Sequence, residues 1–476
     1  DGAITGSSTI NGVGIKADIT NFTNGILISQ NANTGTLNAA NNNTGLGDTV
    51  FAALTTGDSN VGVGRNALTA VTTGSTNTGL GKDSLESTTT GSSNTGVGAG
   101  ALESNTTADN NTAVGNNSLQ QNTTGASNVA MGATALDANT TGAQNVAVGK
   151  GSLTANTTAS NNVSIGNNAM ETNTTGANNV AVGGNAMNVN TTGAQNVAVG
   201  QTALDANTTA SNNTAVGYAS LTANTTGASN TAVGATALDA NTTGASNTSI
   251  GFESLTTNTT GSKCVAVGAG SLSDQNPSSA TDMFNTAVGF NAGASVTTGT
   301  DATIIGALAG DAITTAAGCT LVGKEAGTAI TTGGDNTGIG KGALKAHTTG
   351  TGNVAVGKDA LEANTTASDN VAVGKFALTA NTTGASNTAV GALALTTNTT
   401  ATGHTAVGFQ ALKANTSGDQ NTAVGSGAAE TNTTGRNNTA VGFEAFHVNT
   451  AGEDNVAIGT TALALLTDGD DNTAVG

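Results

Sequence analysis

The chain has 476 residues, of which 36% are apolar, 9% are charged and 2% are aromatic, with 68 glycines and no tryptophan. Its net charge of −18 argues against a general affinity for nucleic acids, because phosphate contacts need clustered Lys and Arg. No apolar run reaches the roughly 18 residues that a membrane-spanning segment needs.

A short tandem repeat fills almost the whole chain. Residues 1–40 lack it, and we expect an irregular N-terminal cap there. From 41 to 476, glycines recur every 17 residues, with a single 21-residue step between Gly268 and Gly289. Each ends a run such as Asn-Thr-Ala-Val-Gly, and the rest of the unit reads x-x-Ala/Ser-Leu-x-Ala-Asn-Thr-Thr-Gly-x-x. Counted from the first Asn as position 1, with the anchor Gly at position 5, the chain contains 26 repeats.

The repeat predicts β-coils. The unit is too short for a helical pair of about 34 residues, and Gly, Asn, Thr and Val disfavour helix. We expect two β-segments per coil, at positions 1–5 and 8–11, with positions 2, 4 and 9 buried. Gly at position 5 and the Asn-Thr-Thr-Gly run supply the two bends. The sequence therefore predicts an all-β parallel β-solenoid whose coils lie about 4.8 Å apart and whose Asn residues at positions 1 and 12 stack as amide ladders.

One coil offers few apolar side chains, so a single thin rod would be poorly stabilised. Small Ala residues at positions 3 and 8 are expected to form a second apolar face on which another chain can pack. We therefore predict lateral self-association, as a homotrimer.

Two local departures from the repeat carry further predictions. Residues 273–285 contain a four-residue insertion with Pro277, which should bulge from one coil without breaking the stack. Cys264 and Cys319 both occupy position 1, three coils or about 14 Å apart, whereas a disulfide needs Cα atoms within about 7 Å. We expect two free thiols. Because the last repeat stops at Gly476, the natural protein is expected to continue.

Most of the reactive side chains are scattered. His347, His404 and His447 fall on three different columns and are expected to face solvent, so no metal site, catalytic cluster or cofactor site is predicted. Acidic residues collect at position 10, where a solvated outer face would explain them: Glu86, Glu103, Asp137, Glu171, Asp205, Asp239 and Glu362. The Asn-Thr-Thr sequons could be glycosylated only in a protein secreted by a eukaryote, and we interpret them as turns.

Position 6 is the candidate binding edge. It holds Lys324, Lys341, Lys358 and Lys375 in four consecutive coils, and elsewhere Tyr218, Phe252, Phe290, Phe409 and Phe443. Cations and aromatic rings on one exposed edge could hold a glycan or an anionic surface. A merely permissive corner that collects variety is the alternative. Glu325 and Asp359, at position 7, are expected to offset part of the repulsion between the lysines.

The runs Asn-Val-Ala-Val-Gly (145–149) and Asn-Val-Ser-Ile-Gly (162–166) resemble the head repeats of YadA-like trimeric adhesins. The fuller unit, Asn-Thr-Ala-Val-Gly-x-x-Ala-Leu-x-x-Asn-Thr-Thr-Gly, is similar to repeats of phage tail-fibre proteins, as is the segment 26–47. The resemblance implies a left-handed parallel β-roll, three chains around an axis and the short strand facing inward. It implies no catalytic or ligand-binding residue.

These observations together predict a structural or adhesive fibre and not an enzyme. The leading expectation is an extracellular phage tail-fibre or virion-fibre shaft that presents host-recognition elements. Its expected partners are its own copies, other fibre proteins and a host glycan or receptor, with no nucleic acid and no membrane insertion. A bacterial surface adhesin is the alternative. An ice-binding solenoid is a third class, although adjacent threonines in each Asn-Thr-Thr turn do not guarantee a flat two-column Thr face.

Overall fold

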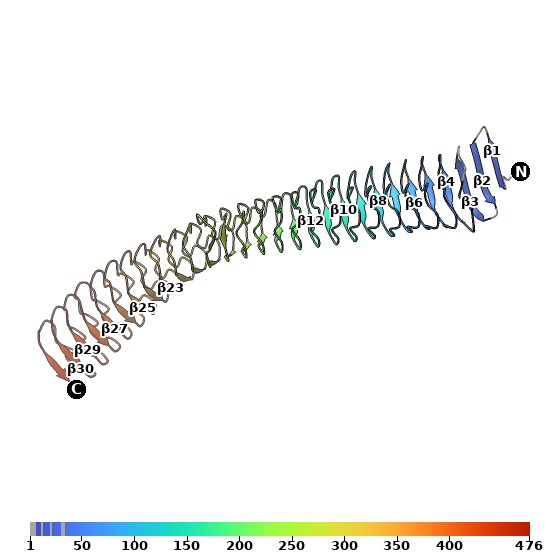
Figure 1. Ribbon diagram of the computed structural model, residues 1–476. Coiled ribbons are helices and arrows are strands. Elements are labelled where there is room, and N and C mark those ends of the chain that lie inside the picture. Colours follow the sequence, from blue (N-terminus) through green and yellow to red (C-terminus); the bar gives the residue numbers. More distant parts are fainter. Residues whose placement is uncertain (1–5, 11–12, 20, 30–33) are drawn as a thin grey trace. The chain divides into compact units, whose positions relative to one another are not determined.

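The computed structural model describes residues 6–10, 13–19, 21–29 and 34–476. The chain divides into two compact units, Asp1–Ala235 and Thr236–Gly476, and among the described residues there are strands and turns but no helix. Each unit is a parallel β-solenoid with a 17-residue coil, and together they hold about 26 coils, as the sequence predicted. The strands of successive coils lie side by side within each unit (Figure 1).

The first unit begins with strands that differ from the repeat. β1 (Gly6–Ile10), β2 (Val13–Ile19) and β3 (Phe22–Ser29) pair antiparallel, and β3 then pairs parallel with β4 (Thr44–Leu46). The N-terminal segment 1–40, which we expected to be an irregular cap, therefore contains three antiparallel strands. Residues 1–5, 11–12, 20 and 30–33 of this segment lie outside the described part of the chain. The later strands of this unit are β5 (Val61–Val63), β6 (Thr78–Leu80), β7 (Thr95–Val97), β8 (Thr112–Val114), β9 (Val129–Met131), β10 (Val146–Val148), β11 (Val163–Ile165), β12 (Val180–Val182), β13 (Val197–Val199), β14 (Thr214–Val216) and β15 (Thr231–Val233).

The second unit continues the same coil. Its strands are β16 (Thr248–Ile250), β17 (Gly261–Ser262), β18 (Val265–Val267), β19 (Thr281–Asp282), β20 (Thr286–Val288), β21 (Thr303–Ile305), β22 (Thr320–Val322), β23 (Thr337–Ile339), β24 (Val354–Val356), β25 (Val371–Val373), β26 (Thr388–Val390), β27 (Thr405–Val407), β28 (Thr422–Val424), β29 (Thr439–Val441), β30 (Val456–Ile458) and β31 (Thr473–Val475).

The insertion leaves the stack intact. β18 pairs in parallel with β20 across it, and Val265 lies opposite Thr286 in the same register as in ordinary coils. The extra residues are tied back by a short parallel pairing of β17 with β19 and by an ion pair of 2.6 Å between Lys263 and Asp282. The predicted bulge without interruption is confirmed.

The burial pattern reverses the expected faces of the strand. In β8, Ala113 at position 3 is fully buried, whereas Thr112 and Val114 at positions 2 and 4 are only half-buried. The same pattern recurs from coil to coil, so the prediction that positions 2 and 4 fill the core was wrong. Position 9 is buried as predicted, for example at Leu119. Positions 3 and 8, expected to offer a face to another chain, point instead into the coil.

The second predicted β-segment does not exist in residues 41–476. Positions 6–11 form consecutive turns, because the backbone adopts positive φ at positions 7 and 9, with 53° at Asn117 and 51° at Leu119. Neighbouring coils are still joined there, as in the bond of 2.9 Å from Leu119 N–H to the carbonyl of Ala135. The sequence could not indicate this bend, since leucine rarely adopts positive φ.

The two columns of asparagine are confirmed as amide ladders, and both lie inside the coil. At position 1, Asn128 Nδ2 donates to Asn111 Oδ1 at 3.2 Å; at position 12, Asn139 Nδ2 donates to Asn122 Oδ1 at 2.8 Å. Both Asn128 and Asn139 also donate to the carbonyl of Gly142, at position 15. The ladders therefore satisfy buried backbone groups along the turn as well as one another.

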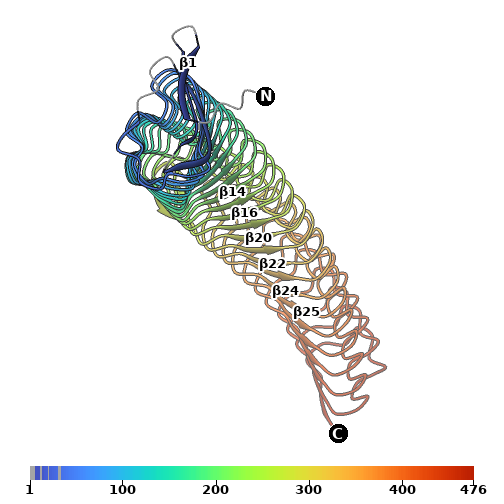
Figure 2. The ribbon, with the colours of Figure 1, turned by 90° about the vertical axis from the view of Figure 1, so that its right-hand side faces the viewer.

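The anchor glycine is required by close approach of the backbone. Gly115 has a φ of 138°, and a Cβ there would lie 2.5 Å from the carbonyl oxygen of Gly132 in the next coil. A side chain at position 5 would force the coils apart, as the sequence suggested. Figure 2 shows the closed loops of successive coils superposed around the interior of the first unit.

Candidate functional site: two outer surfaces of the coil

The first surface, here called the outer stripe, consists of the outward residues at positions 2 and 4. Position 2 is Thr or Val in all 26 repeats, and position 4 is Val, Ile, Leu or Met. Met131, Ile165 and Ile305 are about two-fifths exposed, at 45%, 40% and 38%. The outer stripe thus presents β-branched and apolar side chains in two parallel columns with no charged residue. Sequence reasoning missed it, although a position restricted mainly to Gly, Ala and Ser, such as position 3, indicates the crowded inner side of a narrow coil.

The second surface, here called the corner edge, consists of the residues at position 6. They follow the anchor glycine and point outward at the corner of each coil. A backbone ladder fixes this corner: the amide of position 7 donates to the carbonyl of position 6 in the preceding coil, as from Gly342 to Lys324 at 3.1 Å. Side chains of the corner edge therefore stand in line along each unit, about 4.8 Å apart.

The four lysines that follow one another in consecutive coils of the corner edge divide into two kinds. Lys324 pairs with Glu325 at 3.2 Å and Lys358 pairs with Asp359 at 3.4 Å, as the sequence predicted. Glu325 also binds Lys345, and these two lysines lower the pKa of its carboxyl group, Lys345 more strongly. Exposed pairs of this kind contribute little stability.

Lys341 and Lys375 have no carboxylate at position 7. Lys341 is followed by Gly342, whereas Lys375 is followed by Phe376, whose ring centre lies 4.9 Å from Lys375 Nζ. Among the four consecutive lysines, these two have the ammonium groups best able to meet an anionic ligand.

The aromatic residues of the corner edge are strongly exposed. Tyr218, Phe252, Phe290, Phe409 and Phe443 have 51–59% of their surface accessible. Five of the ten aromatic residues of the chain thus occupy one position in 17. They lie in the line that the sequence predicted, but each unit brings together only its own: Tyr218 in the first unit and the four phenylalanines in the second.

The histidine prediction needs correction. His347 and His404 are buried and not solvent-facing, because positions 12 and 1 lie inside the coil. His404 Nδ1 accepts a hydrogen bond of 3.1 Å from the amide of Asn421, and burial lowers the pKa of His404 to about 4. Burial also lowers the pKa of His347. His447 lies near Glu430, and no group of side chains in the described part of the chain could hold a metal ion.

The acidic column at position 10 is half-buried and not fully solvated. Burial raises the pKa of Glu86, Asp137 and Asp205. Neutral donors separate several of the carboxylates: Gln120 donates to Glu103 at 2.5 Å, Asn188 to Glu171 at 3.2 Å and Thr256 to Asp239 at 2.7 Å. This column is therefore part of the stacking of the coils.

Both cysteines are free and buried, as predicted. Burial raises the pKa of Cys264 to about 11 and also raises that of Cys319. Position 1 faces the interior, so neither thiol is available to a second folded chain.

The Asn-Thr-Thr sequons are equally inaccessible in the folded coil. Asn139, for example, is fully buried, and its Nδ2 donates to Asn122 and Gly142. A glycan on this nitrogen would require the coil to open, which supports their interpretation as turns.

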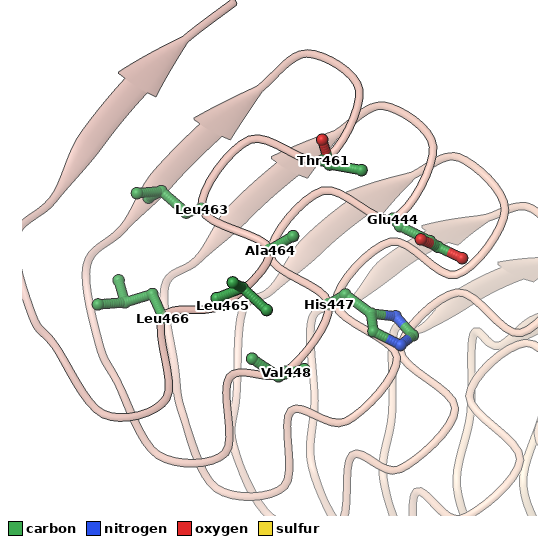
Figure 3. Close-up of a pocket in the computed structure, with 8 residues that line it drawn as sticks. All are labelled: Glu444, His447, Val448, Thr461, Leu463, Ala464, Leu465 and Leu466. Atoms are coloured by element: carbon green, nitrogen blue, oxygen red, sulfur yellow. The ribbon is translucent and has the colours of Figure 1, made fainter.

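One hollow of about 690 Å³ lies at the last coil (Figure 3). Leu463 and Leu466 line it together with His447 and Glu444. Positions 9 and 12 are core positions, so this hollow exposes the coil interior beside the final turn and has no cluster of reactive groups.

The geometry defines a class of protein, the parallel β-solenoid built from tandem repeats. No model of a known protein family matches the chain, and no curated protein sequence is significantly similar to it. The part of the chain that the structure describes includes no helix long and apolar enough to cross a lipid bilayer.

Proposed function

We propose that the chain is the shaft of an extracellular structural or adhesive fibre that assembles laterally from copies of itself. A repetitive β-solenoid suits a structural, fibre-like role. The observation that carries the assembly is the outer stripe: two uncharged columns, with Thr or Val at position 2 and Val, Ile, Leu or Met at position 4, repeat in every coil. The column at position 4 is apolar in every coil, and monomeric soluble proteins rarely leave so continuous an apolar surface uncovered.

A second copy of the chain is the partner that fits best. The outer stripe repeats with the coil spacing, so only a surface with the same spacing can meet it coil after coil. Another copy provides that spacing, and a closed symmetric assembly covers the same stripe on every chain. A homotrimer agrees with the resemblance to trimeric adhesins and tail fibres, and assembly by the outer stripe replaces the earlier expectation of contact through positions 3 and 8.

Sedimentation of charged variants tests this assembly. Val146→Lys together with Val180→Lys places two ammonium groups in the outer stripe and should convert the assembly to monomers, because a buried unpaired charge is costly. Thr141→Lys with Thr175→Lys adds the same charge on the exposed turn and should leave it intact. A monomeric wild-type chain would contradict self-association, and a dimer or tetramer would contradict the trimer.

We also propose that the corner edge contributes to binding of the fibre to the surface of host cells. Replacing Lys324, Lys341, Lys358 and Lys375 by Gln should weaken attachment to host cells and flatten its dependence on salt. Most of that effect should reside in Lys341 and Lys375, which have no carboxylate beside them. Attachment unaffected by all four changes would leave the lysines as solubilising residues.

The resemblance of the repeat to those of phage tail fibres favours a virion fibre, and a bacterial surface adhesin is the alternative. Immunogold labelling of virions and of bacterial cells distinguishes them. We propose no enzymatic activity.

A further inference from the structure

The aromatic part of the corner edge contains the same arrangement twice. In the first, Phe252 and Phe290 lie two coils apart, and the coil between them carries Ala269-Gly270. In the second, Phe409 and Phe443 flank Ser426-Gly427 in the same way. Each arrangement, here called a notch, therefore has a ring at either side and two small residues between them. Both notches lie in the second unit.

Backbone hydrogen bonds hold each notch in shape. In the first, Gly270 donates to Phe252 at 3.0 Å and Asn291 donates to the carbonyl of Ala269 at 2.9 Å. In the second notch, the corresponding bonds from Gly427 and Glu444 measure 2.9 and 3.0 Å. Two coil spacings place the residues that carry the rings about 9.6 Å apart along the stack.

The glycine adds no side chain of its own to the middle of each notch. Gly270 and Gly427 have φ of 66° and 65°, and a Cβ on Gly270 would lie 2.2 Å from Asn291 Oδ1. A Cβ on Gly427 would lie 3.3 Å from Glu444 Cγ. The amide of Asn291 and the side chain of Glu444 thus lie over the floor of their notches. Glu253 and Gln410, which follow the other ring of each notch, add further hydrogen-bonding groups.

Folding does not require these rings. Other coils carry Ala, Asn, Lys or Ser at position 6, and the four phenylalanines are 51–57% exposed. Leaving large apolar side chains in water forgoes the free energy that their burial would contribute. Two independent copies of such an arrangement indicate a ligand that covers the rings.

We propose that the two notches bind an uncharged polysaccharide, with its chain lying along the stack of coils. The C–H faces of sugar rings match the electron-rich faces of phenyl rings, and amide and carboxylate groups bind sugar hydroxyls. The notches contain carboxylates at Glu253 and Glu444 and no lysine or arginine at positions 6 and 7, which disfavours an anionic chain. An extended β-1,4-linked chain turns the same face outward at every second sugar, an interval close to two coil spacings.

This inference deepens the proposed role as a surface fibre, but it depends on different residues from the outer stripe. Lateral assembly can therefore be measured separately in each variant. If the rings instead covered a second copy of the chain, their removal would change the sedimentation of the assembly.

The test uses the full chain with neutral probes: insoluble cellulose and chitin for pull-down, and cellohexaose and chitohexaose for calorimetry. Wild type should bind at least one of the two sugar types. Replacing Phe252, Phe290, Phe409 and Phe443 together by Ala should weaken that binding by about tenfold or more. Phe284→Ala is the matched control, since Phe284 is 52% exposed but belongs to the insertion and not to a notch.

A second variant fills the notches without removing a ring. Ala269→Phe with Ser426→Phe places a third ring between the other two, at a position where neighbouring coils already accept Phe. It should also weaken binding while sedimentation stays unchanged. Wild type that binds no neutral probe, binds only dextran sulfate, or binds equally well after the fourfold replacement would overturn the inference.

Discussion

Residues 111–230 of the first unit and 285–344 of the second fill the same coil in different ways. In the first region, Asn occupies positions 1 and 12 throughout, with Ala or Ser at position 3 and Leu or Met at position 9. In the second region, position 12 is apolar, at Val296, Ile313 and Ile330, and position 9 is glycine at residues 293, 310 and 327. The interior of the same backbone coil can therefore be filled either by ladders of asparagine or by apolar side chains.

The apolar region shows an exchange of volume between positions 3 and 9. Gly310 and Gly327 share their coils with Ile304 and Leu321 at position 3. The coil of Gly293 keeps Ala at position 3, but Ile304 of the next coil lies beside Gly293, 2.9 Å from where its Cβ would be. A Cβ on Gly327 would lie 2.7 Å from Leu321 Cδ1 and 2.8 Å from Ile330 Cδ1, so these side chains occupy the space that leucine fills elsewhere. The exchange also removes the strain of a leucine at positive φ.

Each kind of interior extends over several consecutive coils, because an asparagine of the ladder needs asparagines in the neighbouring coils as hydrogen-bond partners. Residues at the borders join unlike coils. Gln275 donates to Cys264 Sγ at 3.0 Å and accepts from Asn285 at 2.9 Å. His347 reproduces the bond of an asparagine by contacting the carbonyl of Gly350 at 2.8 Å. The interior of a coil is therefore set by columns of residues that run through several coils and not by the single repeat.

The largest expected loss of stability comes from removing the large side chain at position 3 of a coil that has glycine at position 9. Leu321→Ala leaves a cavity between the side chains of Ile313 and Ile330 and should lower the free energy of unfolding by about 2–5 kcal/mol. Gly327→Leu alone should clash. Combining the two restores the consensus pair of Ala and Leu and should recover part of the loss. Denaturant midpoints of the three variants measure this, and a double variant weaker than either single one would contradict the exchange.

A smaller loss of stability is expected when one asparagine of the amide ladder is removed. Asn139→Ala removes a donor to Asn122 and Gly142 and an acceptor for Asn156, leaving buried groups unpaired. The expected loss is about 3 kcal/mol, visible also as faster hydrogen exchange in that coil. Thr141→Ala, on the exposed turn, should change the stability by less than about 0.5 kcal/mol. An equal effect of both changes would show that the ladder does not stabilise the coil.

A pH-dependent loss of stability is expected at His404, where histidine replaces an asparagine of the ladder at position 1. His404 has a folded pKa of about 4 against an ordinary value of 6.5. Its neutral form is therefore favoured in the folded state. Its contribution is constant above about pH 6.5 and is lost as the pH falls towards 4, because only the unfolded chain takes up the proton.

At pH 5 the loss amounts to about 2 kcal/mol. His404→Asn restores the consensus residue and should remove this part of the pH dependence, while leaving that of the carboxylates. Equal pH profiles of unfolding for wild type and variant would contradict the assignment.

The sequence predicted the period, the parallel stack, the amide ladders, the insertion and the free thiols, because each follows from identical residues at a fixed spacing. It did not predict which face of the strand turns inward. In Thr112-Ala113-Val114, β-branched residues are usual core residues, yet Leu119 and the asparagines leave room only for Ala at position 3. The bend at positions 7 and 9 was hidden for another reason: leucine gives no local signal of positive φ. Of the candidate site, the line of position 6 and the pairing of Lys324 and Lys358 with the carboxylates at position 7 were predictable, whereas the further ion pair of Glu325 with Lys345 depends on side-chain geometry.

The most direct test of the account is a disulfide ruler along the exposed turn. Thr141 and Thr158 occupy position 14 in adjacent coils, so their Cα atoms should lie about 4.8 Å apart, within reach of a disulfide. Thr175 lies one coil further, about 9.6 Å from Thr141 and out of reach. Thr141→Cys with Thr158→Cys should form an intrachain bridge under mild oxidation, and Thr141→Cys with Thr175→Cys should not. A bridge in the second variant, or none in the first, would contradict the 17-residue parallel coil.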